Sequence, residues 1–229
     1  MTDDAVPTRR DEKVLAMFHG GASLIEGPVK RDLVLACEMG SLRRLLEASG
    51  LAFRTLSLDL EENTPNQELL ETLGVTDAAD VAELLVRTRI EEAHARAPGA
   101  LIIGAHQVIS LNGKVLEKPT TVDAARDRLF ELRGKTHELH SAVAVAEEGN
   151  IIWTHVETAQ LTMRAFSPQF VGRYLAATGP QVFESAGAYQ LDGAGLQLFD
   201  RIQGDYLTTL GAPIFLLFAR LRQIGLMAS

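Results

Sequence analysis

The sequence contains a single cysteine, Cys37, so it cannot form a disulfide within the chain. A chain without disulfides is typical of a reducing compartment. The sequence also lacks any apolar run close to the roughly 20 residues that span a bilayer. Its first residues, Met1-Thr2-Asp3-Asp4, are acidic, whereas a secretory signal begins with basic residues. We therefore predict a soluble, cytoplasmic protein without a membrane partner.

Positive charge is scarce as well. The chain has 22 lysine and arginine residues against 30 aspartate and glutamate residues, which gives a formal net charge of −8. Nucleic acid polymers and anionic membranes are bound by surfaces that neutralise phosphate charge, so this balance argues against both as partners. A single nucleotide remains possible, because it needs only a local basic pocket.

What the chain does contain is an ordinary globular composition. Of its 229 residues, 46% are apolar and 23% are charged, which excludes a disordered or fibrous protein. The length predicts one large domain, or one domain with an appendage. Residues 1–30 mix charge, glycine and proline, and we interpret them as an N-terminal extension of a domain at 31–229.

Strands and helices are predicted to alternate along this domain. Strands are expected at 32–36, 53–58, 101–103, 137–145 and 151–163. Helices are expected at 41–49, 76–98, 121–132, 167–177 and 214–224. Asn112-Gly113 predicts a hairpin turn, because both positions tolerate a positive φ. Interleaved helices and strands together with hairpins indicate an α/β protein with a mixed sheet.

Polar segments follow several of the predicted strands, where α/β proteins usually build their sites. The acidic segment 59–62 is either a solvated loop or a source of carboxylate oxygens for Mg²⁺. Residues 104–107 are expected to end a strand, and the following hairpin can bring His106 close to Lys118. This pair is either a base with a phosphate-neutralising cation, or an edge histidine and a surface lysine.

A further polar segment is rich in glycine and runs from Ser185 to Gly195. Glycine lets the backbone approach a ligand closely, and Tyr189 offers an aromatic face. The carboxylate of Asp192 can accept two parallel hydrogen bonds from a guanine base. The alternative is a glycine-rich connection without a ligand. From residue chemistry alone, the sequence predicts a polar cleft in an α/β domain.

Taken in order, these segments resemble the Maf family of nucleoside triphosphate pyrophosphatases, from about Leu33 to Leu221. The motifs that carry the resemblance are Gly104-Ala105-x-x-Val108, Glu117-Lys118-Pro119, Leu132-x-Gly134-Lys135-Thr136-His137, Glu157-Thr158, Ala186-Gly187-Ala188-Tyr189, and Gly204-Asp205-Tyr206 leading to Gly211-Ala212-Pro213. Each motif is short, but their common order and spacing make the resemblance specific.

The resemblance implies a two-lobed α/β fold, in which a curved mixed sheet is flanked by helices around a central cleft. It also implies cleavage of a nucleoside triphosphate to a monophosphate and pyrophosphate with a divalent metal cation, Mg²⁺ or Mn²⁺. A homodimer would fit the family. The catalytic residues it implies are His106, Glu62 and Lys118, with Glu62 and His106 as metal ligands. The substrate-binding residues it implies are Ser41, Arg43, Gln107, Lys135 and Asp192.

The residues at the positions that set base preference, Gln107 and Asp192, resemble those of the family's 7-methyl-GTP subgroup. A carboxylate at Asp192 can pair with the two edge N–H groups of guanine. Methylation at N7 makes the base cationic, which strengthens its stacking and its attraction to an anion. The resemblance therefore favours a guanine nucleotide, 7-methyl-GTP among them.

The sequence departs from the family at its first motif, Ser-x-Ser-x-x-Arg, where it has Cys37, Met39 and Leu42. Arg43 and Arg44 come one and two residues late, about 100° and 200° further round a helix. Either arginine can still reach a phosphate if the helix starts differently; otherwise both are solvated, and this second reading is favoured for Arg44.

A second departure is His106, which stands where the family has an aspartate thought to accept a proton. Imidazole binds Mg²⁺ poorly but suits Mn²⁺, Co²⁺ or Zn²⁺. Three outcomes follow: catalysis with His106 as the base, catalysis with a softer metal, or nucleotide binding without catalysis. The alternative to an enzyme is thus a catalytically impaired nucleotide-binding protein with a regulatory role in septum formation.

Overall fold

The computed structural model of the protein describes residues 31–37, 39–58, 75 and 77–227. Its strands form a seven-stranded sheet in the order β2-β1-β3-β5-β6-β7, with β4 paired to β3 off this path. The strands are β1 (Leu33–Ala36), β2 (Arg54–Thr55), β3 (Leu101–Leu111), β4 (Lys114–Val115), β5 (Thr136–Glu147), β6 (Asn150–Met163) and β7 (Phe199–Gln203). The β1 strand is parallel to β2 and β3, and the other pairs are antiparallel, so the predicted mixed sheet is confirmed.

The helices flank this sheet. They are α2 (Gly40–Ala48), α4 (Ala78–Arg96), α5 (Val122–Leu132), α6 (Pro168–Thr178), α7 (Tyr206–Thr209) and α8 (Ile214–Gln223), with short 3-10 helices η1 (Gly179–Phe183) and η2 (Ala194–Leu198). Among the described residues, no helix has the length and apolar character needed to cross a membrane.

Local sequence signals account for several helix ends. Thr121 caps α5 by accepting a hydrogen bond from the backbone N–H of Ala124, and Ser167 caps α6 in the same way, as predicted. The cap of α4 is Asp77. Thr76, the cap expected from the sequence, lies outside the described residues.

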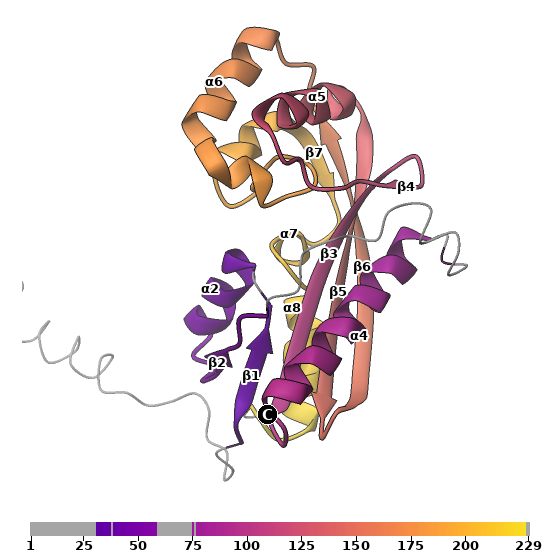
Figure 1. The fold of residues 1–229 in the computed structure, drawn as a ribbon, viewed down its shortest axis with the longest axis vertical. Coiled ribbons are helices and arrows are strands. Elements are labelled where there is room, and N and C mark those ends of the chain that lie inside the picture. Colours follow the sequence, from indigo (N-terminus) through magenta and orange to yellow (C-terminus); the bar gives the residue numbers. More distant parts are fainter. Residues whose placement is uncertain (1–30, 38, 59–74, 76, 228–229) are drawn as a thin grey trace, which may run out of the picture.

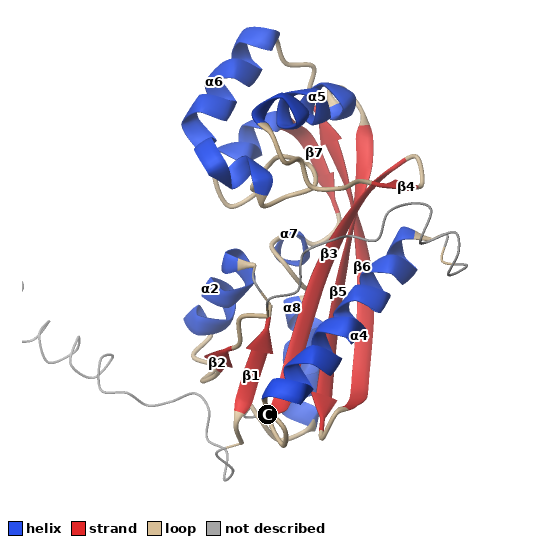
Figure 2. Ribbon diagram, viewed as in Figure 1, coloured by secondary structure: helices blue, strands red, loops and turns tan. Residues whose placement is uncertain are grey.

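The molecule has two lobes that share the long strands β3, β5 and β6 (Figures 1 and 2). One lobe holds β1, β2, α2, α4 and α8, and the other holds α5, α6 and β7. In the first lobe, side chains alternate across the sheet. Val34 and Ala36 pack on the α4 side, whereas Leu33 and Leu35 pack on the side of α2 and α8. The core of the second lobe lies between the sheet and α5 and α6. The predicted two-lobed α/β architecture is confirmed.

Two strand predictions need correction. The strand expected at 101–103 runs on to Leu111, because residues 101–110 all pair with β5. Residues 104–107 therefore lie in the middle of β3 and do not end a strand. The second strand is only Arg54–Thr55, shorter than the expected 53–58. The hairpin turn at Asn112-Gly113 is confirmed, with φ values of 53° and 77°.

Candidate active site

A cavity of about 530 Å³ lies where the middle of β3 meets the start of α2 and the loop between η1 and η2. Its lining includes five residues predicted from the sequence, namely Ser41, His106, Gln107, Lys118 and Asp192. The long β3–β5 pairing carries His106 and Gln107 from the sheet into this cavity. The segment after the β3–β4 hairpin brings Lys118 to it, as the sequence predicted. Glu62, the remaining predicted catalytic residue, lies outside the described residues.

Two predicted substrate-binding residues are not brought to the cavity. Arg43 is exposed on α2, and its Nε lies 3.8 Å from Oε1 of Glu47 one helical turn away. Lys135 is exposed in the turn before β5, where its backbone carbonyl accepts a hydrogen bond from the N–H of Met163. Neither residue lines the cavity, and substrate contacts by either one stay predictions.

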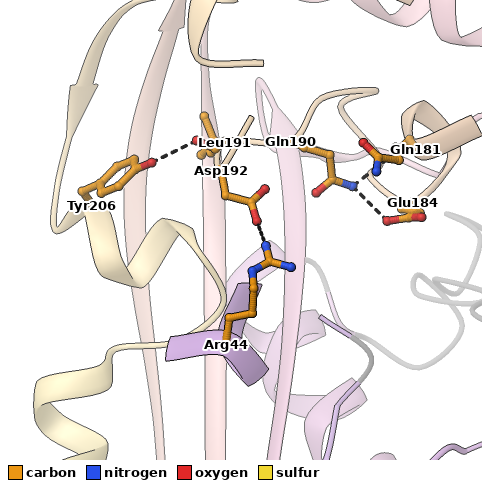
Figure 3. Close-up of polar contacts among 7 residues, drawn as sticks. All are labelled: Arg44, Gln181, Glu184, Gln190, Leu191, Asp192 and Tyr206. Carbon is orange, nitrogen blue, oxygen red and sulfur yellow. Dashed lines mark hydrogen bonds and ion pairs between the residues drawn. The ribbon is translucent and has the colours of Figure 1, made fainter. Parts of the chain in front are cut away.

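Arg44, interpreted from the sequence as a solvated arginine, is exposed and also forms an ion pair with Asp192 (Figure 3). The reason is the orientation of α2. Leu42 is fully buried in the core, so the position where the family has an arginine faces inward. Ser41 and Arg44 are three residues apart and share another face of the helix. Both line a second cavity of about 330 Å³, next to the first.

The loop that carries Asp192 is braced on both sides (Figure 3). The amide Nε2 of Gln190 donates to the carbonyl of Gln181 at 3.3 Å and to Oε2 of Glu184 at 3.2 Å. The hydroxyl of Tyr206 donates to the carbonyl of Leu191 at 2.9 Å. These bonds hold the two residues that precede Asp192, and its carboxylate lies beside the cavity.

Hydrogen bonds within the protein orient the side-chain amide of Gln107. Its Nε2 donates to Oγ of Ser141 at 2.8 Å and to the carbonyls of Thr208 and Thr209, each at 3.2 Å. Because a carbonyl can only accept, Nε2 must point toward these partners. Oε1, an acceptor, is then the amide atom that these three bonds leave unused. Gln107 and Asp192 thus both offer acceptors in the same cavity.

His106 has a partner that the sequence analysis missed, Arg89 of α4. Nε of Arg89 donates to Nδ1 of His106 at 3.2 Å, and both residues line the cavity. Burial, and after it the positive charge of Arg89, lower the pKa of His106 from 6.5 to about 3. The imidazole is therefore neutral near pH 7. The sequence carries one signal for Arg89: it falls at helical spacing among the buried residues Val86, Ile90 and Ala93.

The described residues do not fit a metal ion at His106. A histidine that binds a metal through Nε2 carries its ring proton on Nδ1, yet Nδ1 accepts a hydrogen bond from Arg89 here. The guanidinium would also repel a second cation. No group of three or more histidine, cysteine, aspartate or glutamate side chains suited to a metal occurs in the described part of the chain. The expectation that His106 is a metal ligand therefore disagrees with the structure.

The same bond weakens the case for His106 as a base. To take a proton on Nε2, the neutral ring must hold its own proton on Nδ1, and it then becomes a cation beside Arg89. Both states cost the Arg89 hydrogen bond. The neutral ring with Nε2–H is the form that this environment stabilises.

Comparisons with known proteins show which family the chain belongs to. It matches the model of the family described as "Maf-like protein" over residues 32–224, and the chain therefore belongs to the Maf family. Among its relatives, the 7-methyl-GTP pyrophosphatase of Brucella abortus biovar 1 (strain 9-941) is 40% identical over 191 residues, which cover 83% of this chain and 95% of the relative. The nucleoside triphosphate pyrophosphatase of Caulobacter vibrioides is 40% identical over 193 residues, covering 84% and 96%.

Solved structures also align with the chain, among them a nucleoside-triphosphatase / dITP/XTP pyrophosphatase from Mycobacterium abscessus. It is 14% identical and covers 66% of this chain and 96% of its own, with a TM-score of 0.34. A similarity of this size carries no argument about the site.

Proposed function

We propose that the protein is a nucleoside triphosphate pyrophosphatase that acts on a guanine nucleotide such as 7-methyl-GTP. The observation that carries the proposal is the cavity itself, which gathers Ser41, Gln107, Lys118 and Asp192 from separate parts of the chain. Two relatives at 40% identity, named for pyrophosphatase activity, support the reaction type. The products are the nucleoside monophosphate and pyrophosphate.

The residues of the cavity divide by chemistry into two groups. Lys118 and Ser41 offer a cation and a hydroxyl donor, which suit the triphosphate. Oε1 of Gln107 and the carboxylate of Asp192 are acceptors, which suit the edge N–H groups of guanine. A positively charged 7-methylguanine base gains further attraction to Asp192.

In the reaction, a water oxygen bonds to the α-phosphorus while the α–β phosphoanhydride bond breaks and pyrophosphate leaves. The proton that the water loses passes to the surrounding solvent. The positive charge of Lys118 offsets the negative charge that develops on the leaving group. The divalent cation expected from the family resemblance stays a prediction, because Glu62 lies outside the described residues. No step proposed for these residues depends on it.

A second candidate function is nucleotide binding without turnover, in a regulatory protein linked with septum formation. The observation that favours it is the pair of replacements at Leu42 and His106. Leu42 is buried in the core, and His106 is held neutral by its surroundings. Neither supplies the guanidinium or the carboxylate that the family has there.

Pyrophosphate release separates the two candidates. The full-length protein is incubated with 7-methyl-GTP, GTP, dTTP and UTP, in Mg²⁺ and in Mn²⁺. An enzyme releases pyrophosphate fastest from a guanine nucleotide and loses this activity in Lys118→Ala. Lys114→Ala is the matched control, because Lys114 is exposed on β4 and does not line the cavity.

Two other outcomes are informative. If the wild type is inert while His106→Asp releases pyrophosphate, the protein is a binding protein with a lost catalytic residue. If no nucleotide is hydrolysed and none raises the melting temperature, both candidate functions are wrong.

A further inference from the structure

The hydrogen bond between Arg89 and His106 fixes the chemistry of the imidazole ring. Nε of Arg89 can only donate, so Nδ1 of His106 must accept and must carry a lone pair. The single proton of the neutral ring is then on Nε2. His106 therefore presents an N–H group on the side of the ring away from Arg89.

The surroundings of His106 suit an anion. Lys118 and Ser41 share the cavity with it, and Arg89 lies behind the ring. Among the described residues, the lining has two carboxylates, and each has a partner in the protein: Glu184 accepts from Gln190, and Asp192 is paired with Arg44. In an acidic protein, this part of the surface is thus supplied with a lysine, a hydroxyl group and an imidazole N–H group.

We propose that His106 binds a phosphate group of the ligand by donating its Nε2–H, and that Arg89 is the positioning residue that fixes this tautomer. The position where the resemblance implies a metal ligand or a base is then an anion-binding position in this chain. The proposal rests on the proposed function for the identity of the ligand, a nucleoside triphosphate. Its direct consequence is that phosphate binding at His106 needs no divalent cation.

Two histidine variants separate a donor at Nε2 from other roles of the ring. In His106→Gln the side-chain amide reaches about as far as Nε2 and retains an N–H donor there. In His106→Asn the shorter amide reaches only the position of Nδ1. In His106→Asp a carboxylate faces the ligand, so an anion is repelled until a cation bridges the two.

The test is calorimetric titration of the full-length protein, first in EDTA and then in Mg²⁺. The probes are inorganic tripolyphosphate and a GTP analogue with a methylene bridge between the α- and β-phosphates. We expect the wild type to bind both probes in EDTA, with His106→Gln within about threefold of it. His106→Asn is expected to bind about tenfold more weakly, which is the loss of one hydrogen bond to a charged group. His106→Asp is expected to bind only in Mg²⁺.

The role of Arg89 has a separate readout. The long-range ¹H–¹⁵N spectrum of the imidazole ring reports which nitrogen carries the proton. We expect the Nε2–H tautomer in the wild type and in Arg89→Lys, which retains a donor, and a mixture of tautomers in Arg89→Met. A role for Arg89 in packing alone would leave the tautomer unchanged in all three proteins.

Several results overturn the proposal: no binding of tripolyphosphate by the wild type in EDTA, equal binding by His106→Asn and His106→Gln, or an Nδ1–H tautomer in the wild type. A measurement of pyrophosphate release distinguishes failure of this proposal from failure of the proposed function. If the protein hydrolyses a nucleotide but its phosphate binding is the same in the His106 variants, only the inference about His106 is wrong. If the His106 variants bind phosphate in the expected order but no nucleotide is hydrolysed, only the proposal of an enzyme is wrong.

Discussion

Arg44 and Asp192 form an ion pair that joins α2 of one lobe to the glycine-rich loop of the other (Figure 3). The side chain of Arg44 is 60% exposed and that of Asp192 is 25% exposed. The pair lies where both cavities meet, since Asp192 lines each of them. The carboxylate of Asp192, which we propose to bind the guanine base, is therefore oriented by a residue of the opposite lobe.

We predict that Arg44→Ala weakens binding of guanine nucleotides about threefold. The change removes the partner that orients Asp192, and exposed ion pairs contribute only about 0.2–1 kcal/mol. Arg43→Ala is the matched control on the same helix, because Arg43 does not line either cavity. The measurement is the dissociation constant of the methylene-bridged GTP analogue. Equal effects of the two substitutions would show that the ion pair does not orient the carboxylate.

Gln107→Glu is predicted to lower the free energy of unfolding by about 2–3 kcal/mol. The new carboxylate faces the carbonyls of Thr208 and Thr209, which accept hydrogen bonds from Nε2 in the native protein. The carbonyl of Thr208 still accepts from Oγ of Ser141 and from the N–H of Gly211. The carbonyl of Thr209 loses its donor and faces the new carboxylate, which is costly when both are buried from water. Urea unfolding measures the change, with Gln203→Glu on the exposed side of β7 as the charge-matched control. Unchanged stability in Gln107→Glu would argue that its amide is oriented the other way.

The sequence predicted those features that depend on neighbouring residues. The caps Thr121 and Ser167 and the turn at Asn112-Gly113 are set by local backbone chemistry, and the structure has all of them. The hairpin also indicated correctly that His106 and Lys118 share a cavity.

Features that depend on distant residues were not predictable in this way. β3 continues through its polar middle because β5 pairs with it, and no local pattern records that partner. Arg89 reaches His106 only because α4 packs across the sheet, and Arg44 reaches Asp192 only because Leu42 turns α2 toward the core. The spacing of residues along a helix determines which of them share a face, but it does not determine which part of the protein packs against that face.

Gly195→Ala is predicted to disrupt the loop that carries Asp192 and to weaken nucleotide binding at least tenfold. A Cβ atom on Gly195 would lie 2.2 Å from the carbonyl oxygen of Gln190, which is backbone and cannot move without displacing its neighbours. Gly193→Ala is the control, because a Cβ atom there meets nothing within 4 Å. Titration with the GTP analogue and thermal unfolding measure both effects. The prediction fails if the two variants bind alike.

The last prediction concerns His137, which is 1% exposed and hydrogen-bonded through Nε2 to the hydroxyl of Tyr189 at 2.8 Å. Burial lowers the pKa of His137 from 6.5 to about 4. Well above pH 6.5 the ring is neutral in both the folded and the unfolded chain, so it adds no pH dependence there. Between pH 6.5 and pH 4 the unfolded chain binds a proton that the folded chain does not, so stability falls as the pH falls.

Over that whole interval, His137 alone is expected to remove about 3 kcal/mol of stability. Urea unfolding of the wild type at pH 7 and at pH 5 measures the part of this loss that falls between those values. The control is His137→Gln, which keeps a polar group near Tyr189 but does not titrate. Burial also lowers the pKa of His106 and His140, so the variant should retain a reduced pH dependence and not lose it entirely. A variant whose stability falls with pH as steeply as that of the wild type would mean that His137 is protonated in the folded protein, and that its bond to Tyr189 survives the charge.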